Sequence, residues 1–393
     1  MSDHLGVTAL GAWEATSGIA EYGRRTVAAL VAAGVDVTLT NIANGAGVDR
    51  SRLSPLLAAL PRDIKSPISI SFLNINEQFF ANDSDLRPVR SSYVVAMWHW
   101  EVPSVPVVMR REIDRVDEIW VSSIYSQRSL SRYTDKPIIV VPSVIEPKNS
   151  REFERKHFGI PEDAGVTYLF TFDAHSTFAR KNPFAVIEAF RQAFTEAEMG
   201  HGATLVVKAI HLDSYPDARE RLRREVLAVK GVLLEHDMSG DEVAGLLQSA
   251  DVYVSLHRSE GFGLGMAEAM YFGTPVIATA HSGNMDYMNS FNSCPVGYQS
   301  SVISSEVLAY NPRMSEVYEY GNVWADPNVE DAAAWMRWLY EDESRRVRIG
   351  LLAASMVAKR YSLKAVGEVL RERLEIISSS SNHGEFTEPS RGN

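Results

Sequence analysis

Residues 258–279 read RSEGFGLGMAEAMYFGTPVIAT, and this stretch decides the fold of the chain around it. The run before it, DVYVSLH at residues 251–257, is apolar and contains β-branched residues, which is typical of a buried strand. A loop with glycines at positions 261, 263 and 265 follows, and a helix is predicted to begin near Leu264. A Gly-Thr-Pro then opens a second short apolar run, residues 274–279. A strand, a glycine loop, a helix and a strand in this order indicate a parallel α/β sheet.

Two glutamates, Glu260 and Glu268, flank the glycine loop. The N-terminus of a helix leaves several N–H groups free, and its dipole favours an anion such as phosphate. Glu260 ends the strand, where it can accept hydrogen bonds from hydroxyl groups, and Glu268 lies about one turn into the helix. Together these features suit a ligand that is part phosphate and part polyol, such as a nucleotide sugar. By composition alone, a solvated Glu260 and a Glu268 that merely caps the helix would explain the pattern equally well.

The alternation of strands and helices extends along the chain in two blocks, separated by a polar, proline-containing stretch at residues 145–165. Strands are predicted at residues 5–13, 35–41, 68–74, 93–100, 118–123 and 137–142, and then at residues 166–173, 203–210, 231–236, 251–257 and 274–279. Such alternation predicts two doubly wound, parallel-sheet, Rossmann-like domains that face a central cleft. We expect these domains at residues 1–147 and 148–360, a terminal helix at residues 361–378 and a disordered tail at residues 379–393.

Composition limits the classes of partner. The 393-residue chain has 39 Lys and Arg against 50 Asp and Glu, and its net charge of −11 argues against nucleic acid as the main partner. A single cysteine, Cys294, excludes an intramolecular disulfide and fits a reducing cytoplasm. No secretory signal is visible, and no apolar run reaches about 18 residues. These observations predict a cytoplasmic protein without a membrane span.

Arginines gather between residues 110 and 136, at positions 110, 111, 115, 128 and 132. Two interpretations remain open for them. A solvated helix face is the interpretation we favour, and a peripheral contact with the anionic inner face of the membrane is the other.

The stretch from Glu260 to Ala278, EGFGLGMAEAMYFGTPVIA, resembles the signature of the retaining glycosyltransferases of family 4 within the glycosyl transferases group 1, which have the GT-B fold. Their two glutamates match Glu260 and Glu268, and the phenylalanine, the glycines and the G-T-P-V-I-A continuation also agree. A looser resemblance extends over essentially the whole chain. It implies that Glu260 contacts the hydroxyls of a donor sugar and that Glu268 contacts the ribose. It also implies that the loop at Gly263, with the amides of Leu264 and Gly265, meets the diphosphate.

Two further stretches carry donor-binding residues of the family. FARKNP, residues 178–183, follows a strand and precedes a helix, where Arg180 and Lys181 could neutralise a diphosphate leaving group. The family often has another arginine where this sequence has His175. TSGIAEYGR, residues 16–24, resembles the family's glycine loop near the donor phosphate, with Gly18 as the matching residue.

The stretch MWHWE, residues 97–101, ends a predicted strand. A histidine between two tryptophans belongs more often to a core than to a catalytic site, but the family has a histidine here that contacts the sugar. The resemblance therefore implies a catalytic role for His99. Trp98, Trp100 and Glu101 could shape the acceptor side.

The function that the resemblance implies is that of a retaining hexosyltransferase. It would move a hexose from GDP-mannose or a UDP-sugar to a hydroxyl of a glycan or lipid-linked glycan, as in bacterial lipopolysaccharide or other cell-surface polysaccharide synthesis. The first domain would take the acceptor, the second the nucleotide sugar, and the terminal helix would cross back to the first domain. We expect no metal and no other cofactor, because Asp83 and Asp85 resemble a metal-binding D-x-D motif only within a hydrophilic stretch that reads as a solvated turn.

Other classes of protein remain open. A nucleotide-sugar epimerase or a phosphorylase could share the fold. A nicotinamide-dependent oxidoreductase would use the first strand–helix–strand unit, but no G-x-G-x-x-G opens that helix and no acidic residue ends the strand at residues 35–41 to hold a ribose hydroxyl. A sugar-binding protein without enzymatic activity would normally be exported, and no signal peptide is visible.

Overall fold

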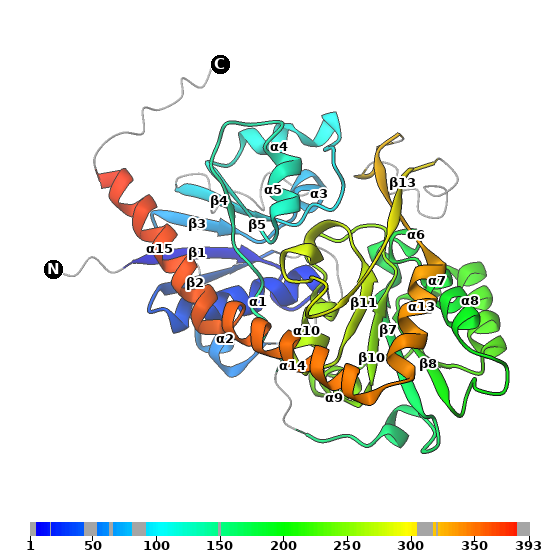
Figure 1. Cartoon of the computed structure of the whole chain (residues 1–393). Helices are drawn as coiled ribbons and strands as arrows, with labels where there is room; N and C mark the ends of the chain where they lie inside the picture. The colour runs from blue at the N-terminus through cyan, green and yellow to red at the C-terminus, as the bar shows by residue number, and fades with distance from the viewer. Residues whose placement is uncertain are drawn as a thin grey trace.

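The computed structural model describes residues 5–15, 17–42, 53–62, 66–80, 92–147, 151–304, 317–319 and 321–382. These residues form two α/β domains, each built on a parallel six-stranded sheet (Figure 1). The metal-like motif at Asp83 and Asp85 lies outside the described residues.

The first domain carries a sheet with the strand order β2-β1-β3-β4-β5-β6, in which all neighbouring strands are parallel. The order reverses between β1 and β3, which makes this the topological switch point of the sheet. The strands are β1 (Gly6–Gly11), β2 (Asp36–Asn41), β3 (Ile68–Ser71), β4 (Tyr93–Trp98), β5 (Glu118–Val121) and β6 (Ile138–Val140). The helices are α1 (Gly18–Ala32), α2 (Pro55–Ala59), α3 (Ile75–Phe80), the 3₁₀ turn η3 (Val107–Met109), α4 (Arg111–Asp114) and α5 (Ile124–Leu130).

The second domain carries a sheet with the order β12-β11-β10-β7-β8-β9, which reverses between β7 and β10. Its strands are β7 (Val166–Asp173), β8 (Ala203–Ile210), β9 (Val232–Leu234), β10 (Val252–Ser255), β11 (Val276–Thr279) and β12 (Cys294–Val296). Its α-helices are α6 (Phe178–Lys181), α7 (Pro183–Ala193), α8 (Pro216–Ala228), α9 (Gly240–Ser249), α10 (Leu264–Tyr271), α13 (Val329–Tyr340) and α14 (Glu343–Arg360). Its 3₁₀ turns are η4 (Arg155–Phe158), η5 (Ala174–Ser176), η6 (Leu212–Ser214) and η7 (Ser282–Asp286).

Apolar side chains cover both faces of both sheets, which is why the strands read as near-continuous hydrophobic runs. In β1, Val7 contributes to the core on one face and Leu10 to the core on the other. Successive side chains of a strand alternate between the two faces, so each strand supplies two cores.

Local signals set several helix starts. Ser239 and Glu242 form a reciprocal capping box at the start of α9. Asn182 stands at the N-cap position of α7, but its side chain does not cap the helix. Its backbone is left-handed, and its side-chain amide donates to the carbonyl of Leu256 at 3.0 Å instead. The asparagine therefore ties the start of α7 to the end of β10.

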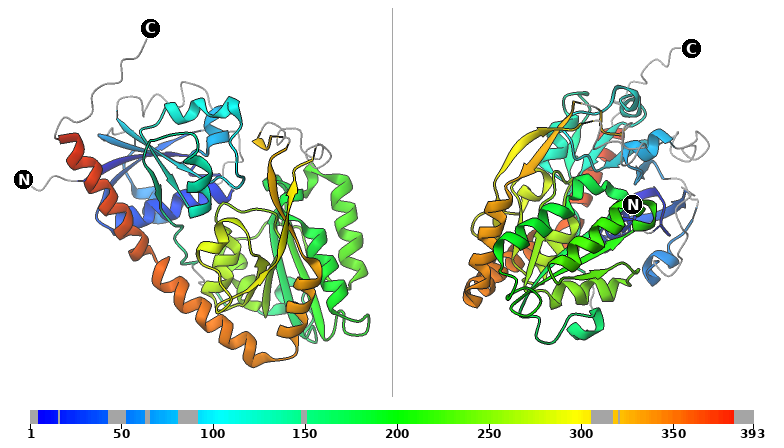
Figure 2. Two further views of the ribbon diagram at one scale, coloured as in Figure 1. Left: turned by 45° about the horizontal axis from the view of Figure 1, so that its top comes forward. Right: turned by 90° about the vertical axis from the view of Figure 1, so that its right-hand side faces the viewer.

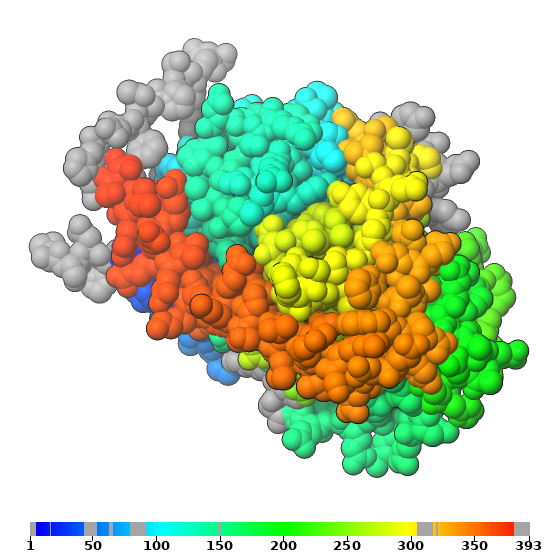
Figure 3. Space-filling model, viewed as in Figure 1, coloured from blue at the N-terminus to red at the C-terminus, as the bar shows by residue number. Residues whose placement is uncertain are grey.

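The chain returns to the first domain through α14 and α15 (Leu363–Asn382). Val357 of α14 packs in a core of the second domain, whereas Val366, Leu370 and Leu374 of α15 pack in a core of the first. Figures 2 and 3 show the two helices as one orange-to-red band across both domains. Gly367 allows this close packing, because a Cβ there would lie 2.8 Å from the carbonyl of Ala29 in α1.

An antiparallel hairpin, β13 (Tyr298–Val302) and β14 (Val323–Pro327), extends from the second domain toward the first. Tyr318 and Trp324 pack in the same core cluster as Trp100 and Val102 of the first domain. In Figure 3 the yellow and orange residues of this region lie directly beside cyan residues of the first domain.

The predicted fold class, two doubly wound parallel sheets that face each other, is confirmed. The sequence did not predict β12, the hairpin or α14. The tail was predicted to begin at residue 379, and this boundary is wrong because α15 continues to Asn382. Residues 383–393 lie outside the described residues.

Candidate active site

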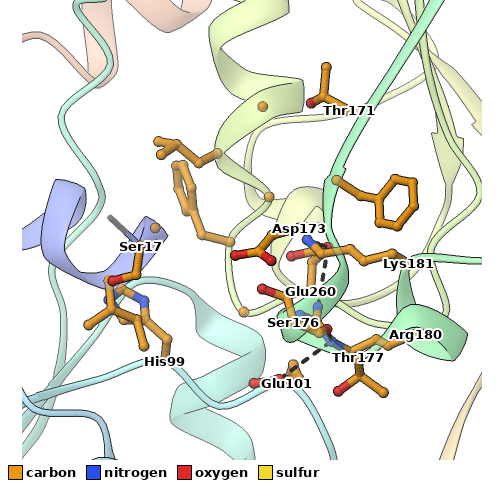
Figure 4. Close-up of a pocket in the computed structure, with 18 of the residues that line it drawn as sticks. Ser17, His99, Glu101, Thr171, Asp173, Ser176, Thr177, Arg180, Lys181 and Glu260 are labelled. Carbon is orange, nitrogen blue, oxygen red and sulfur yellow. Dashed lines mark hydrogen bonds and ion pairs between the residues drawn. The ribbon is translucent and has the colours of Figure 1, made fainter. Parts of the chain in front are cut away.

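A cavity of about 460 Å³ lies between the two domains, at the carboxyl ends of the strands of both sheets. The first domain lines it with residues that follow β1, β3 and β4, and the second with residues that follow β7 and β10. Both switch points therefore open into this cavity, and ligands of open α/β sheets bind at such points. Figure 4 shows His99 of the first domain and, from the second domain, Lys181 and Glu260 at this cavity.

The amino end of α10 lines the cavity with Gly263, Leu264 and Gly265. Gly263 precedes the helix with φ +89°, and a Cβ there would come within 2.2 Å of the Met266 side chain, so the turn requires glycine. The N–H groups of Leu264 and Gly265 belong to the first helical turn and have no partner within the helix. This end of α10 can therefore accept an anion. Gly18, at the amino end of α1, lines the cavity from the opposite domain.

Glu260 pairs with the two cations at the end of α6. Its Oε1 lies 2.5 Å from Lys181 Nζ and 3.2 Å from Arg180 Nη1. Burial by itself raises the pKa of Glu260, but the charges of Lys181 and Arg180 outweigh it and lower this pKa to about 2. Glu260 is therefore an ionised acceptor at neutral pH.

Arg180 is fixed by more than this pair. Its Nη1 donates to the carbonyl of Ser259 at 2.7 Å, and its Nε lies 3.5 Å from the carboxylate of Glu101. The hydroxyl of Tyr318, from the segment between the hairpin strands, donates to the same carboxylate of Glu101. Two cations and two carboxylates thus balance one another, and an entering anion would compete with Glu260 and Glu101 for the cations.

Glu268 does not line the cavity, although the resemblance implies that it contacts the ribose of the donor. Its Oε1 lies 2.6 Å from Nη2 of Arg25, which α1 of the first domain contributes. Glu268 nevertheless lies on the face of α10 that carries Leu264 and Gly265, because these positions are four and three residues before it.

His99 lines the cavity at the end of β4. Asn74 holds its backbone with two hydrogen bonds of 2.9 Å, and Ser122 Oγ lies 2.9 Å from its Nδ1. The ring meets the edge of Tyr22 at a centroid distance of 4.2 Å. Burial lowers the pKa of His99 to about 4, so its ring is neutral at neutral pH.

Only two of the three residues proposed for the acceptor side line the cavity. Trp100 and Glu101 line the cavity, whereas Trp98 is fully buried in a core cluster of the first domain and does not reach it. Trp98 is the last residue of β4, whereas Trp100 lies beyond the strand, in the segment that lines the cavity. The structure thus leaves Trp98 out of the set that was expected to shape the acceptor side.

One group of side chains in the described part of the chain combines metal-ligand types within a short distance, namely Asp173, His175 and His211. Asp173 ends β7 and His211 follows β8, and these parallel neighbours bring together residues that are far apart in sequence. His211 Nδ1 lies 2.7 Å from Asp173 Oδ1, and the two imidazole rings stack in parallel at 4.2 Å. Two parallel rings cannot both point a nitrogen at one ion, so metal binding would require one ring to rotate.

The sequence patterns did not predict several residues of the site. Arg25 and Tyr22 lie on α1 within a stretch that reads as an ordinary amphipathic helix. Tyr318 follows a polar stretch without periodicity. The only available signal for Arg25 was its spacing from Glu21, the i, i+4 pair that holds it at 2.7 Å.

Among the helices that the structure describes, none is long and apolar enough to cross a membrane.

Two doubly wound sheets with a cavity between their carboxyl edges define the GT-B class of fold, and solved structures of glycosyltransferases share it. The structure of Anabaena Alr3699/HepE in complex with UDP and glucose matches with a TM-score of 0.69 at 13% identity, over 95% of this chain and 100% of that chain. Sucrose-phosphate synthase from Thermosynechococcus elongatus matches with a TM-score of 0.66 at 15% identity, over 96% of this chain and 100% of that one. The pneumococcal O-GlcNAc transferase GtfA, in complex with UDP and GlcNAc, matches with a TM-score of 0.54 at 15% identity, over 79% of this chain and 57% of that longer chain.

Residues 151–355 match the family model of the glycosyl transferases group 1. Because this match spans more than half of the chain, the protein belongs to that family and is a glycosyltransferase. No curated protein sequence matches the chain.

Proposed function

We propose that this protein is a retaining, metal-independent glycosyltransferase of family 4. It moves a hexose from a nucleoside-diphosphate sugar, either GDP-mannose or a UDP-sugar, to a hydroxyl of a glycan or lipid-linked glycan. Such an acceptor fits a cytoplasmic role in the synthesis of bacterial cell-surface polysaccharide. The UDP complexes of two of the similar structures support a nucleotide donor.

The observation that carries the proposal is the grouping of Lys181, Arg180 and Glu260 beside the amino end of α10. The helix end and the two cations offer positive charge where a diphosphate departs, and Glu260 offers an acceptor for the hydroxyls of the sugar. A diphosphate that draws Lys181 away from Glu260 frees that carboxylate for the sugar. Binding of the diphosphate by Lys181 is thus coupled to binding of the sugar by Glu260.

The remaining residues of the site follow from this arrangement. Neutral His99 hydrogen-bonds the sugar from the first domain, while Trp100 and Glu101 border the acceptor. Of the described carboxylates that line the cavity, Glu101 and Asp173 are held by neighbouring side chains, and Glu260 binds the hydroxyls of the sugar in this proposal. This favours attack by the acceptor on the face of the leaving group, with the departing phosphate accepting its proton, over attack by an enzyme carboxylate.

Cations of the chain, rather than a metal, would stabilise the leaving diphosphate. Arg180 and Lys181 supply two cations, and α10 adds its dipole without reorganisation. An ion held by Asp173, His175 and His211 would require one of the two stacked rings to rotate.

A peripheral contact with the inner face of the membrane is an additional proposal for the arginines between residues 110 and 136. Some of these arginines have partners within the domain, since Arg110 covers the ring of Tyr133 and Arg115 pairs with Glu112 at 3.2 Å. Arg128 and Arg132 are the members that a lipid surface would contact.

The experiment that tests the proposal is a hydrolysis screen over nucleotide sugars, because slow hydrolysis of the donor requires no acceptor. We expect release of a nucleoside diphosphate from GDP-mannose or from one UDP-sugar, and loss of this release in Lys181→Ala. The released sugar should first appear as the anomer of the donor. No release from any nucleotide sugar, or release of the opposite anomer, would refute the donor class or the retention.

A further inference from the structure

Arg25 makes an ion pair that joins the two domains. It lies on α1 of the first domain, and its Nη2 is 2.6 Å from Glu268 Oε1 on α10 of the second. Only 17% of the Arg25 side chain and 10% of the Glu268 side chain are exposed. Because the pair is largely withdrawn from water, removing one partner would leave the other charge poorly compensated.

The position of Arg25 is itself fixed. Its Nε donates to Glu21 Oε1 at 2.7 Å, one turn earlier on α1, and its Nη1 donates to the carbonyl of Val144 at 3.3 Å. Val144 belongs to the segment that leaves the first domain. Three separate nitrogens of the guanidinium therefore join α1, the exit segment and α10, which a planar fork of donors can do and a single ammonium cannot.

Glu268 uses Oε1 for Arg25, which leaves Oε2 for a ligand. On α10 it follows Leu264 and Gly265 on the same helix face, and both of these residues line the cavity. A nucleotide whose diphosphate meets the amino end of α10 thus has its ribose within one helical turn of this carboxylate.

We propose that Arg25 is a positioning residue that aims the Glu268 carboxylate at the ribose of the donor, so that recognition of the 2′-hydroxyl is completed only when the two domains are in contact. The inference rests on the proposed function, in which Glu268 contacts the ribose. Arg25 acts through Glu268 and does not itself touch the nucleotide. The specificity for a ribonucleotide over a deoxyribonucleotide therefore resides partly in the first domain, although the nucleotide binds to the second.

The test compares the affinities of UDP and 2′-deoxy-UDP, or of GDP and 2′-deoxy-GDP where guanine is the bound base, by calorimetry. Glu268→Gln and Arg25→Met are measured against the wild type. In Arg25→Met we expect the affinity for the ribonucleotide to fall by about tenfold and the affinity for the deoxyribonucleotide to change by less than about twofold. The preference for ribose should collapse in the same way in Glu268→Gln.

A matched control separates this role from general loosening of the domain contact. Asn322 donates to the carbonyl of Ser104 at 3.2 Å, between the hairpin and the first domain, and it does not line the cavity. Asn322→Ala should leave the ribose preference at its wild-type value. Should Arg25→Met fold poorly, Arg25→Lys keeps the charge but offers one nitrogen in place of three, and we expect it to lower the preference by about threefold.

The outcomes separate a failure of the proposed donor binding from a failure of the positioning role of Arg25. If neither UDP nor GDP binds the wild type, the proposed donor binding is wrong and the inference falls with it. If the wild type binds a nucleotide but Glu268→Gln keeps the ribose preference, the contact of Glu268 with the ribose is wrong, and the inference falls with that contact alone. If Glu268→Gln loses the preference while Arg25→Met and Arg25→Lys keep it, or lose both nucleotides equally, only the role of Arg25 is refuted.

Discussion

Replacing Lys181 with alanine tests the diphosphate site most directly. Lys181 Nζ lies 2.5 Å from Glu260 Oε1, and both side chains are largely withdrawn from water. A diphosphate must compete with Glu260 for this ammonium, so the net gain from the new contact is smaller than that of an ion pair formed from two solvated groups. A hydrogen bond to a charged group contributes about 1.5–3 kcal/mol, and this competition places Lys181 near the lower end.

We therefore expect Lys181→Ala to weaken the binding of UDP or GDP by about tenfold, measured by calorimetry. The binding of uridine or guanosine should change by less than about twofold, because these ligands carry no phosphate for the ammonium to contact. Lys156→Ala is the matched control, since Lys156 pairs with Glu154 in an exposed position away from the cavity. An equal loss for nucleoside and nucleoside diphosphate would refute the placement of the diphosphate at Lys181.

Four further predictions concern other residues of the site and the packing of α15. Glu260→Gln should lower turnover by about 10- to 100-fold at saturating donor, because an amide accepts sugar hydroxyls less strongly than a carboxylate, and wild-type turnover would contradict this role. Dialysis against EDTA should leave activity unchanged; a loss that Mg²⁺ or Mn²⁺ restores in the wild type but not in His211→Ala would instead assign a metal to Asp173, His175 and His211. Burial lowers the pKa of His99 from 6.5 to about 4, so the unfolded chain protonates this histidine more readily than the folded chain does. The contribution of neutral His99 to the free energy of unfolding is therefore complete above pH 6.5 and is lost as the pH falls toward 4. His99→Asn should thus flatten the dependence of the melting temperature on pH in this window, and an unchanged slope would argue against it. Leu370→Ala should lower the free energy of unfolding by about 2–5 kcal/mol in denaturant titrations, because α15 buries this side chain in the first domain, whereas Val369→Ala on the exposed face should cost less than about 0.5 kcal/mol.

The local sequence determined a large part of the fold and of the candidate site. The alternation of apolar runs with helical periods specified two parallel sheets, since strands buried on both faces and joined by helices have few other arrangements. The glycines around Gly263 specified the turn that starts α10 within a few residues of chain. The place of Glu260 after β10 and of Lys181 after β7 puts both residues at one edge of the sheet, because the carboxyl ends of parallel strands share that edge.

Contacts between distant segments were decided by the tertiary structure alone. The pairing of Arg25 with Glu268 and that of Tyr318 with Glu101 join the two domains, and a helix period cannot specify which residue another domain will present. The meeting of Asp173 with His211 depends on the order of β7 and β8 in the sheet. Trp98 and Trp100 are alike in sequence, yet only Trp100 lines the cavity, because β4 ends at Trp98 and Trp100 belongs to the segment that follows the strand. The sequence thus determined which groups each domain offers to the cleft, and the packing of the domains determined which of those groups meet, since ion pairs and hydrogen bonds form only where the folded backbone brings their atoms within about 3 Å.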